Sequence, residues 1–354
     1  MFRKIISAVT LVLVALVIWQ AREQILEAIN YLANTNLWFI LALIPEQLFM
    51  YYCAGQMFFS YMSAKENADK ISPFNLMRVS FELNFVNHAI PSGGVSGLGY
   101  ITWRLKGFGA TAGQVSFMYL LRYIITICAN QFQTIVAIIV LLIAGGLSAG
   151  AYWTVWVTAA ICVGILALMA IAIAIASSRK RIDWFAKIST RFGNFVVAKV
   201  TFGHRKNVLE YPKVHKYFID LHEDLMTARQ HKKLLVRPII WGIVYSFLEV
   251  ATYWLVAMSM GHPEILPQIM VGEAIGSILG AVLVTPGGVG GYEGAMIFVM
   301  SALGVDLGLA TAAVITTRVV VLVGTIVSGY GFYQHAISKI GKAEKSEIME
   351  QDAR

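Results

Sequence analysis

Two glycine-rich breaks interrupt apolar runs of the chain, and their composition suits anion binding. The first reads Ile90-Pro91-Ser92-Gly93-Gly94-Val95-Ser96-Gly97 and the second reads Thr285-Pro286-Gly287-Gly288-Val289-Gly290-Gly291. Proline cannot continue an incoming helix, and glycine lets a ligand approach the backbone closely. A helix that begins after such a break has unpaired N–H groups and a positive dipole end in its first turn. The breaks therefore predict an anion site, with tight helix crossing at the glycines as the alternative.

Two arginines lie deep in apolar runs, where a charge needs a partner. Arg122 is about 12 Å into the run 114–144, and Arg318 lies at a similar depth in the run 309–335. An arginine in lipid costs several kcal/mol unless it meets a counter-charge or water, so it indicates a functional site. Its guanidinium can bind a phosphate ester through two parallel hydrogen bonds. The alternative is a structural ion pair with one of three buried carboxylates, Glu46, Glu249 or Glu273.

Further polar side chains favour a binding site near these arginines. Arg122, Thr126, Asn130 and Gln133 are spaced i, i+4, i+8 and i+11, which places them on one face of a helix. Glu293 follows the second break and has no acidic counterpart after the first, so we expect an asymmetric site. The residues expected to bind substrate are Ser92, Gly93, Gly94, Gly97, Arg122, Asn130, Gly287, Gly288, Gly291, Glu293 and Arg318.

Three ionisable residues in apolar surroundings could couple substrate binding to an ion. They are Glu46, His88 and Glu249. Salt bridges are the alternative role for the two carboxylates, and a hydrogen-bonded structural role is the alternative for the histidine. We expect no metal site and no cofactor, because the remaining histidines show no metal-ligand spacing.

The composition is that of an integral membrane protein. Hydrophobic residues make up 58% and charged residues 14% of the 354 positions, whereas a soluble domain carries about 25% charge. Runs of about 20 apolar residues can cross a bilayer. We expect full spans at 5–20, 37–62, 114–144, 152–177, 238–260 and 309–335. The first lacks a signal-peptide cleavage site, so residues 1–338 are expected to form one membrane domain and 339–354 a cytoplasmic tail.

The distribution of basic residues predicts the orientation. Of 28 Lys and Arg residues, 14 lie between Arg179 and Arg237, whereas the loops at 145–151 and 260–268 contain none. By the positive-inside rule the basic segment 178–237 and both termini are expected to be cytoplasmic, in the inner membrane of the cell. The stretch 73–113 must then enter and leave on the cytoplasmic side, and 268–305 on the external side.

The two breaks thus belong to an inverted repeat. Repeat 1 covers about 73–144 and repeat 2 about 268–335. Paired broken segments in two halves of a membrane protein indicate a substrate site built from half-helices. The expected fold is an all-α polytopic membrane protein of about eight membrane segments, with two inverted re-entrant hairpins broken at Pro91 and Pro286.

The basic segment 178–237 is predicted to form amphipathic helices on the membrane surface. Trp184, Phe185, Ile188 and Phe192 gather on one side, so anionic headgroups rather than nucleic acid are the expected partner. No G-x-S-x-G motif, P-loop or catalytic carboxylate pair is present, and we therefore expect no enzyme activity.

Several motifs resemble one family of membrane proteins. The Pro-Ser-Gly-Gly-Val-Ser-Gly element, the stretch from Arg104 to Arg122 and the Thr-Pro-Gly-Gly-Val-Gly-Gly-Tyr-Glu-Gly element are similar to the transmembrane part of the lysylphosphatidylglycerol synthase family. This family includes the flippase portion of the multiple peptide resistance factor and stand-alone proteins. The resemblance implies a bundle of about eight membrane segments that moves a modified phospholipid or a polyprenyl-phosphate lipid between leaflets. The chain ends soon after Tyr333 without an acyltransferase domain, so the synthase activity is not expected.

The function expected from the residues and the resemblance together is that of a lipid flippase. The substrate would be a membrane lipid with a phosphate-bearing headgroup. Two alternatives stay open: a scaffold without transport activity for a separate lipid-modifying enzyme or glycosyltransferase, and an ion-coupled carrier of a small anion.

Overall fold

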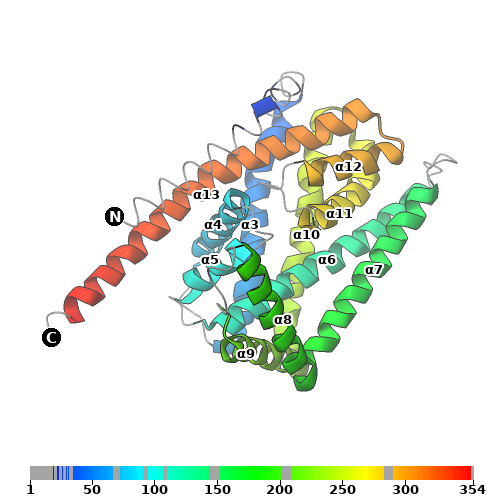
Figure 1. Ribbon diagram of the computed structural model, residues 1–354. Coiled ribbons are helices and arrows are strands. Elements are labelled where there is room, and N and C mark those ends of the chain that lie inside the picture. Colours follow the sequence, from blue (N-terminus) through cyan, green and yellow to red (C-terminus); the bar gives the residue numbers. More distant parts are fainter. Residues whose placement is uncertain are drawn as a thin grey trace.

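The chain folds into a bundle of helices (Figure 1). A computed structural model describes residues 35–66, 72–90, 95–106, 110–143, 152–200, 209–282 and 290–351, with single positions between 19 and 31. Within these residues there is no strand, which confirms the all-α class. The α-helices that they form are α3 (Leu37–Glu66), α4 (Pro73–Ala89), α5 (Val95–Lys106), α6 (Ala112–Ile143), α7 (Tyr152–Ala176), α8 (Arg179–Val200), α9 (Tyr211–Gln230), α10 (Lys233–Ser259), α11 (Leu266–Val282), α12 (Gly291–Ala302) and α13 (Leu307–Gln351).

Five of the described helices are long and apolar enough to cross a membrane. The spanning parts are Leu37–Ser63 of α3, Ala112–Ile143 of α6, Trp156–Ala176 of α7, Lys233–Ser259 of α10 and Leu307–Ser338 of α13. They match five of the six predicted spans to within a few residues. The sixth, at 5–20, lies outside the described residues except for Trp19.

A pair of short helices flanks each glycine-rich break. Helices α4 and α5 flank the first and α11 and α12 flank the second, whereas residues 91–94 and 283–289 at the breaks themselves lie outside the described residues. Ser72 caps α4 by accepting a hydrogen bond from the Asn75 N–H (3.3 Å), and Pro73 follows in the first turn, where its missing N–H is tolerated. Helices thus stand on both sides of each break, and the hairpins and their re-entry on one side of the membrane stay predictions.

The long helix α13 connects the two helix pairs. It runs diagonally past both pairs in Figure 1, and it packs against α4 of the first pair and α12 of the second. Helices α3 and α10 pack side by side along their length between the two pairs. Helices α8 and α9, the predicted amphipathic segment, lie together at one end of the bundle.

Each helix pair has its own apolar core. Around the first pair, Phe58 and Tyr61 of α3 pack with Leu105 of α5 and residues of α6. Around the second pair, Met296 and Met300 of α12 pack with residues of α10, α11 and α13. Close packing within each pair fixes its position relative to the spans. Polar residues lie in the space between the two pairs.

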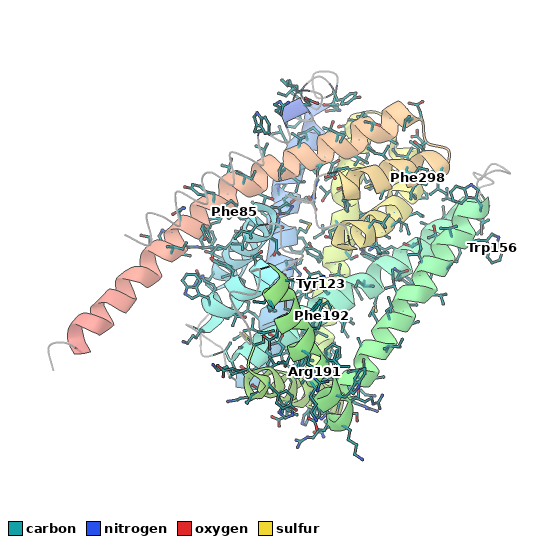
Figure 2. The ribbon with its side chains drawn as sticks, viewed as in Figure 1. Phe85, Tyr123, Trp156, Arg191, Phe192 and Phe298 are labelled. Atoms are coloured by element: carbon teal, nitrogen blue, oxygen red, sulfur yellow. The ribbon has the colours of Figure 1, made fainter. Side chains whose placement is uncertain are left out.

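Helix α7 stands apart from this packing. Only 6% of its most apolar stretch is buried, against 56% for α13. Trp156 (76% exposed) points away from the rest of the molecule (Figure 2), although Thr158 and Cys162 are buried. A helix that is hydrophobic on all sides and unburied within the protein is suited to contact lipid directly.

Candidate functional site

A cavity of ≈ 150 Å³ lies between the two helix pairs. Both pairs contribute to its walls, through α4 of the first pair and through α11 and α12 of the second, and the spans α3, α10 and α13 complete them. Polar side chains from distant parts of the chain therefore meet in one place at the centre of an apolar bundle. Polar groups at membrane depth are rare and mark binding sites or transport pathways.

Buried carboxylates are the most unusual part of the lining. Glu249 of α10 and Glu273 of α11 both face the cavity, and Glu273 is only 2% exposed. Ser277 donates a hydrogen bond to Glu273 Oε1 (2.5 Å), whereas Glu249 Oε2 is buried without a hydrogen-bond partner among the described residues. A buried carboxylate needs a hydrogen bond, a counter-ion or a proton. The Glu249 carboxylate could therefore bind a cation or exchange a proton at this position.

Glu46 lies beside the same cavity in a hydrogen-bonded cluster. Its Oε2 accepts a hydrogen bond from Gln47 Nε2 (2.9 Å), and its Oε1 lies 3.1 Å from Thr252 Oγ1. Gln47 and Thr252 both line the cavity, so they connect Glu46 to it. The alternative that the sequence left open, a salt bridge of Glu46 with Arg122 or Arg318, is not found among the described residues.

His88 is brought to the cavity by α4. It lines the wall, and its Nδ1 lies 2.9 Å from the carbonyl oxygen of Asn84, one turn earlier in the same helix. Asn84 also lines the cavity and bonds to the Tyr51 hydroxyl of α3. The structure thus gathers His88, Glu46 and Glu249, the three residues expected to couple an ion, around one space.

Arg318 also lines the cavity, and Glu293 holds it in place. Arg318 Nε lies 2.7 Å from Glu293 Oε1, and the carboxylate side chain is only 4% exposed. The other oxygen of Glu293 accepts a hydrogen bond from the Gly290 N–H (2.7 Å) at the start of α12. Gly290 has φ +99°, a conformation that favours glycine. Glu293 therefore links the end of the second break to α13, and it is not one of the three carboxylates that the sequence offered as partners for Arg318.

The side chain of Tyr245 separates Arg122 from the cavity. The Arg122 guanidinium lies over the rings of Phe58 (5.6 Å to the ring centroid) and Tyr245 (5.3 Å), and its Nη2 lies 3.5 Å from the Tyr245 hydroxyl. Tyr245 lines the cavity, whereas Arg122 does not. No salt bridge joins Arg122 to a carboxylate in the part of the chain that the structure describes. Cation–π contacts stabilise the charge in place of an ion pair.

The rest of the polar face of α6 packs against α10. Ser246 Oγ donates to Asn130 Oδ1, and Gln133 Nε2 donates to Ser246 Oγ (2.9 Å). Asn130 and Gln133 are 5% and 1% exposed and do not line the cavity. This face is thus paired with a neighbouring helix, although Asn130 was expected to bind substrate.

The glycines of the breaks are described only in part. Ser92, Gly93, Gly94, Gly287 and Gly288 lie outside the described residues. Gly97 and Gly291 lie in the first turns of α5 and α12. A Cβ atom added at Gly97 would collide with the side-chain amide of Asn87 on α4. Close contact between α4 and α5 therefore accounts for the glycine at this position.

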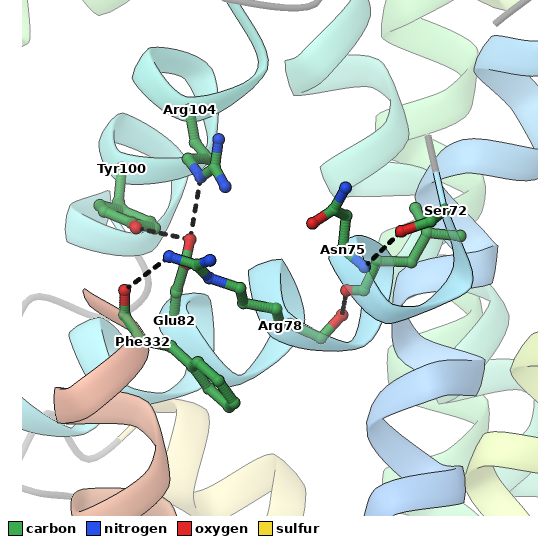
Figure 3. A network of polar contacts seen from close by, with 9 residues as sticks. Ser72, Asn75, Arg78, Glu82, Tyr100, Arg104 and Phe332 are labelled. Atoms are coloured by element: carbon green, nitrogen blue, oxygen red, sulfur yellow. Dashed lines mark hydrogen bonds and ion pairs between the residues drawn. The ribbon is translucent and has the colours of Figure 1, made fainter. Parts of the chain in front are cut away.

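A buried charge network at the first helix pair was not predicted from the sequence (Figure 3). Glu82 of α4, whose side chain is 0% exposed, binds Arg78 Nε (2.9 Å) and Arg104 Nε (3.0 Å) and accepts a hydrogen bond from the Tyr100 hydroxyl (2.8 Å). Arg78 Nη2 also donates to the carbonyl oxygen of Phe332 on α13 (3.3 Å). The i, i+4 spacing of Arg78 and Glu82 was the signal in the sequence.

The fold and the cavity together define a polytopic membrane protein with a polar centre between two helix pairs. The family model described as the lysylphosphatidylglycerol synthase TM region matches residues 5–329, so the chain belongs to this family. Comparisons with curated proteins and with solved structures found no match. Among the described residues no group of three or more metal-binding side chains occurs.

Proposed function

We propose that this protein is a flippase that moves a phospholipid or polyprenyl lipid with a phosphate-bearing headgroup from one leaflet to the other. The cavity between the two helix pairs carries this proposal. Its walls come from both halves of the predicted inverted repeat, an arrangement that suits a site opened to each side of the membrane in turn. The lipid-related family supports the same function.

In this proposal the headgroup binds where the second break meets α13. Arg318 presents a guanidinium to the cavity, and the first turn of α12 begins at Gly291 beside it. A phosphate there gains a charge-assisted hydrogen bond from the arginine and the attraction of the helix dipole. Arg122 contributes only indirectly, since its guanidinium contacts the hydroxyl of Tyr245, which lines the cavity.

The buried carboxylates would serve ion coupling. Glu249 Oε2 has no hydrogen-bond partner among the described residues and could take up a proton or a cation, so arrival of the headgroup and of the ion at one cavity would be linked. The same feature favours the second candidate, an ion-coupled carrier of a small anion. Transport of a substrate without acyl chains is expected of the carrier and not of the flippase, so it would distinguish the two candidates.

We further propose that α8 lies on the anionic surface of the cytoplasmic leaflet of the inner membrane. Trp184, Ile188, Phe192 and Phe195 form an exposed stripe with spacings of i, i+4, i+8 and i+11, while the opposite face packs on α9. Exposed basic residues such as Arg191 adjoin this stripe (Figure 2). Apolar insertion flanked by basic residues is typical of interfacial helices.

The test is lipid transfer by the purified chain in liposomes. Labelled phosphatidylglycerol, its lysyl ester, cardiolipin and a polyprenyl phosphate are offered in turn, together with a soluble phosphate ester. We expect at least one lipid to change leaflet faster than in vesicles that contain Gly94→Leu or Gly288→Leu, which block the breaks. Faster passage of the soluble ester alone would favour the carrier. Unchanged rates for all substrates, with an enzyme co-purifying from cells, would favour the scaffold.

A further inference from the structure

A second pocket opens between α3 and α10, away from the central cavity. It measures ≈ 380 Å³. Tyr52 lines it from α3, whereas the preceding Tyr51 lines the central cavity, so the two sites lie on different faces of the same helix. No residue is shared between the two linings. The pocket is therefore a site of its own, and its chemistry can be considered independently of the proposed transport.

The pocket offers donors for an anion and no acidic group. Arg237 of α10 and Gln56 of α3 supply a guanidinium and a side-chain amide, and none of the residues that line the pocket is acidic. Arg237 is exposed and makes no salt bridge or side-chain hydrogen bond within the described part of the chain. Its charge is available to a ligand. A guanidinium beside an amide suits the oxygens of a phosphate.

The rest of the lining is suited to an acyl chain. Ile240 is exposed and Trp241 is partly exposed beside Tyr52, whose ring meets Trp241 edge-on at 5.5 Å. From Tyr52 to Ser63 the pocket follows about 16 Å of α3, since each helical residue rises 1.5 Å. This length covers a headgroup and the first carbons of its chains. A soluble anion would make no use of the aromatic wall.

The position of the pocket fits the headgroup layer of one leaflet. Ser63 is the last residue of the α3 span, and Arg237 is in the first turns of the α10 span. The same end of the bundle carries the basic helices, because the Tyr61 hydroxyl of α3 donates to the Asp224 carbonyl oxygen of α9 (3.4 Å). Anionic lipids gather at such basic surfaces.

We propose that this pocket is a binding site for an anionic phospholipid, with the phosphate at Arg237 and Gln56 and an acyl chain along Tyr52 and Trp241. The lipid belongs to the leaflet on the same side of the membrane as α8 and α9. It binds from the side, between two spans, and does not pass through the central cavity. This binding proposal does not depend on the proposed transport of lipids.

Native mass spectrometry of the full chain with phosphatidylglycerol and phosphatidylcholine tests this site. We expect one phosphatidylglycerol to bind more tightly than the others, and Arg237→Ala to weaken it by about fivefold or more while phosphatidylcholine binding is unchanged. Arg237→Lys keeps the charge but loses the planar guanidinium, so an intermediate loss is expected. Ser63→Trp fills the pocket without changing any charge and should displace the same lipid.

Two control variants distinguish binding in this pocket from diffuse attraction to the basic surface and from binding in the central cavity. Arg229→Ala removes an exposed arginine of α9 at the same end of the bundle but outside the pocket, and it should leave the tight lipid bound. Arg318→Ala, in the central cavity, should also leave it bound when this less stable variant is kept below its unfolding temperature. Equal losses from Arg229→Ala and Arg237→Ala would show diffuse surface attraction and overturn the proposal. Loss of the lipid only in Arg318→Ala, or its retention in Ser63→Trp, would overturn it as well.

Discussion

At the scale of single residues, the ion pair between Arg318 and Glu293 is the best-defined part of the central site. Removing one partner of a buried pair costs about 3–5 kcal/mol, because the other charge stays buried without compensation. We expect Arg318→Ala to lower the thermal stability of the purified protein, and Glu293→Gln in the same chain to restore part of it. A double-mutant cycle of unfolding free energies measures this coupling. Additive losses would contradict a direct pair.

Gly97 gives a second prediction, and Gly99, two residues further along α5, supplies a matched control. A Cβ at Gly97 would overlap the Asn87 side chain, whereas a Cβ at Gly99 meets nothing within 4 Å. Gly97→Ala should therefore destabilise the protein by about 1–3 kcal/mol through overpacking, while Gly99→Ala should be neutral or slightly stabilising. Thermal unfolding of the two variants side by side checks the difference. Equal stability of the two variants would show that the Asn87 side chain can move aside at no cost.

The chemistry of single residues was predictable from the sequence, and their partners were not. Depth in an apolar run identified Arg122 and Arg318 as unusual, because hydropathy and helical rise are local properties. The partner of Arg318 is Glu293, 25 residues away across a turn, and helix packing decides such a pairing. For the same reason the sequence did not reveal that Arg122 lies over aromatic rings.

At the scale of elements, the Glu82 network joins α4, α5 and α13. Glu82→Gln leaves Arg78 and Arg104, each with a side chain only 14% exposed, without their shared counter-charge. We expect this change to destabilise the protein by about 3 kcal/mol and to broaden the distance distribution between spin labels on α4 and α5. Glu223→Gln breaks an exposed pair with Arg179 and should cost below about 1 kcal/mol. A narrow distribution in Glu82→Gln would show that apolar packing alone holds the helix pair.

Most helices were predictable and the geometry of the helix pairs was not. Spans such as 114–144 follow from runs of apolar residues, and α6 (Ala112–Ile143) confirms this one. The break residues predict where helices stop, because proline and glycine act locally. The side of the membrane on which a pair returns depends on the neighbours of the pair and on the bilayer, so it stays a prediction.

At the scale of the whole molecule, the predicted orientation can be tested without a substrate. In a variant without native cysteines, a cysteine in place of Glu264, an exposed residue after α10, should react with an impermeant thiol reagent added to intact cells. A cysteine in place of the exposed His231, between α9 and α10, should react only after the membrane is opened. The reverse pattern would contradict an orientation determined by the basic residues.

The isolation of α7 has a mechanical consequence. Its spanning stretch, Trp156–Ala176, has 21 residues, which is about 31 Å and close to the thickness of a bilayer's hydrocarbon layer. Because the protein buries only 6% of its most apolar part, few contacts with other helices oppose a change of tilt when the bilayer thickness changes. Only Ser177 and Ser178 separate α7 from α8. A thinner bilayer should therefore increase the tilt of α7 and displace α8. The position of the basic helix α8 would then depend on membrane thickness.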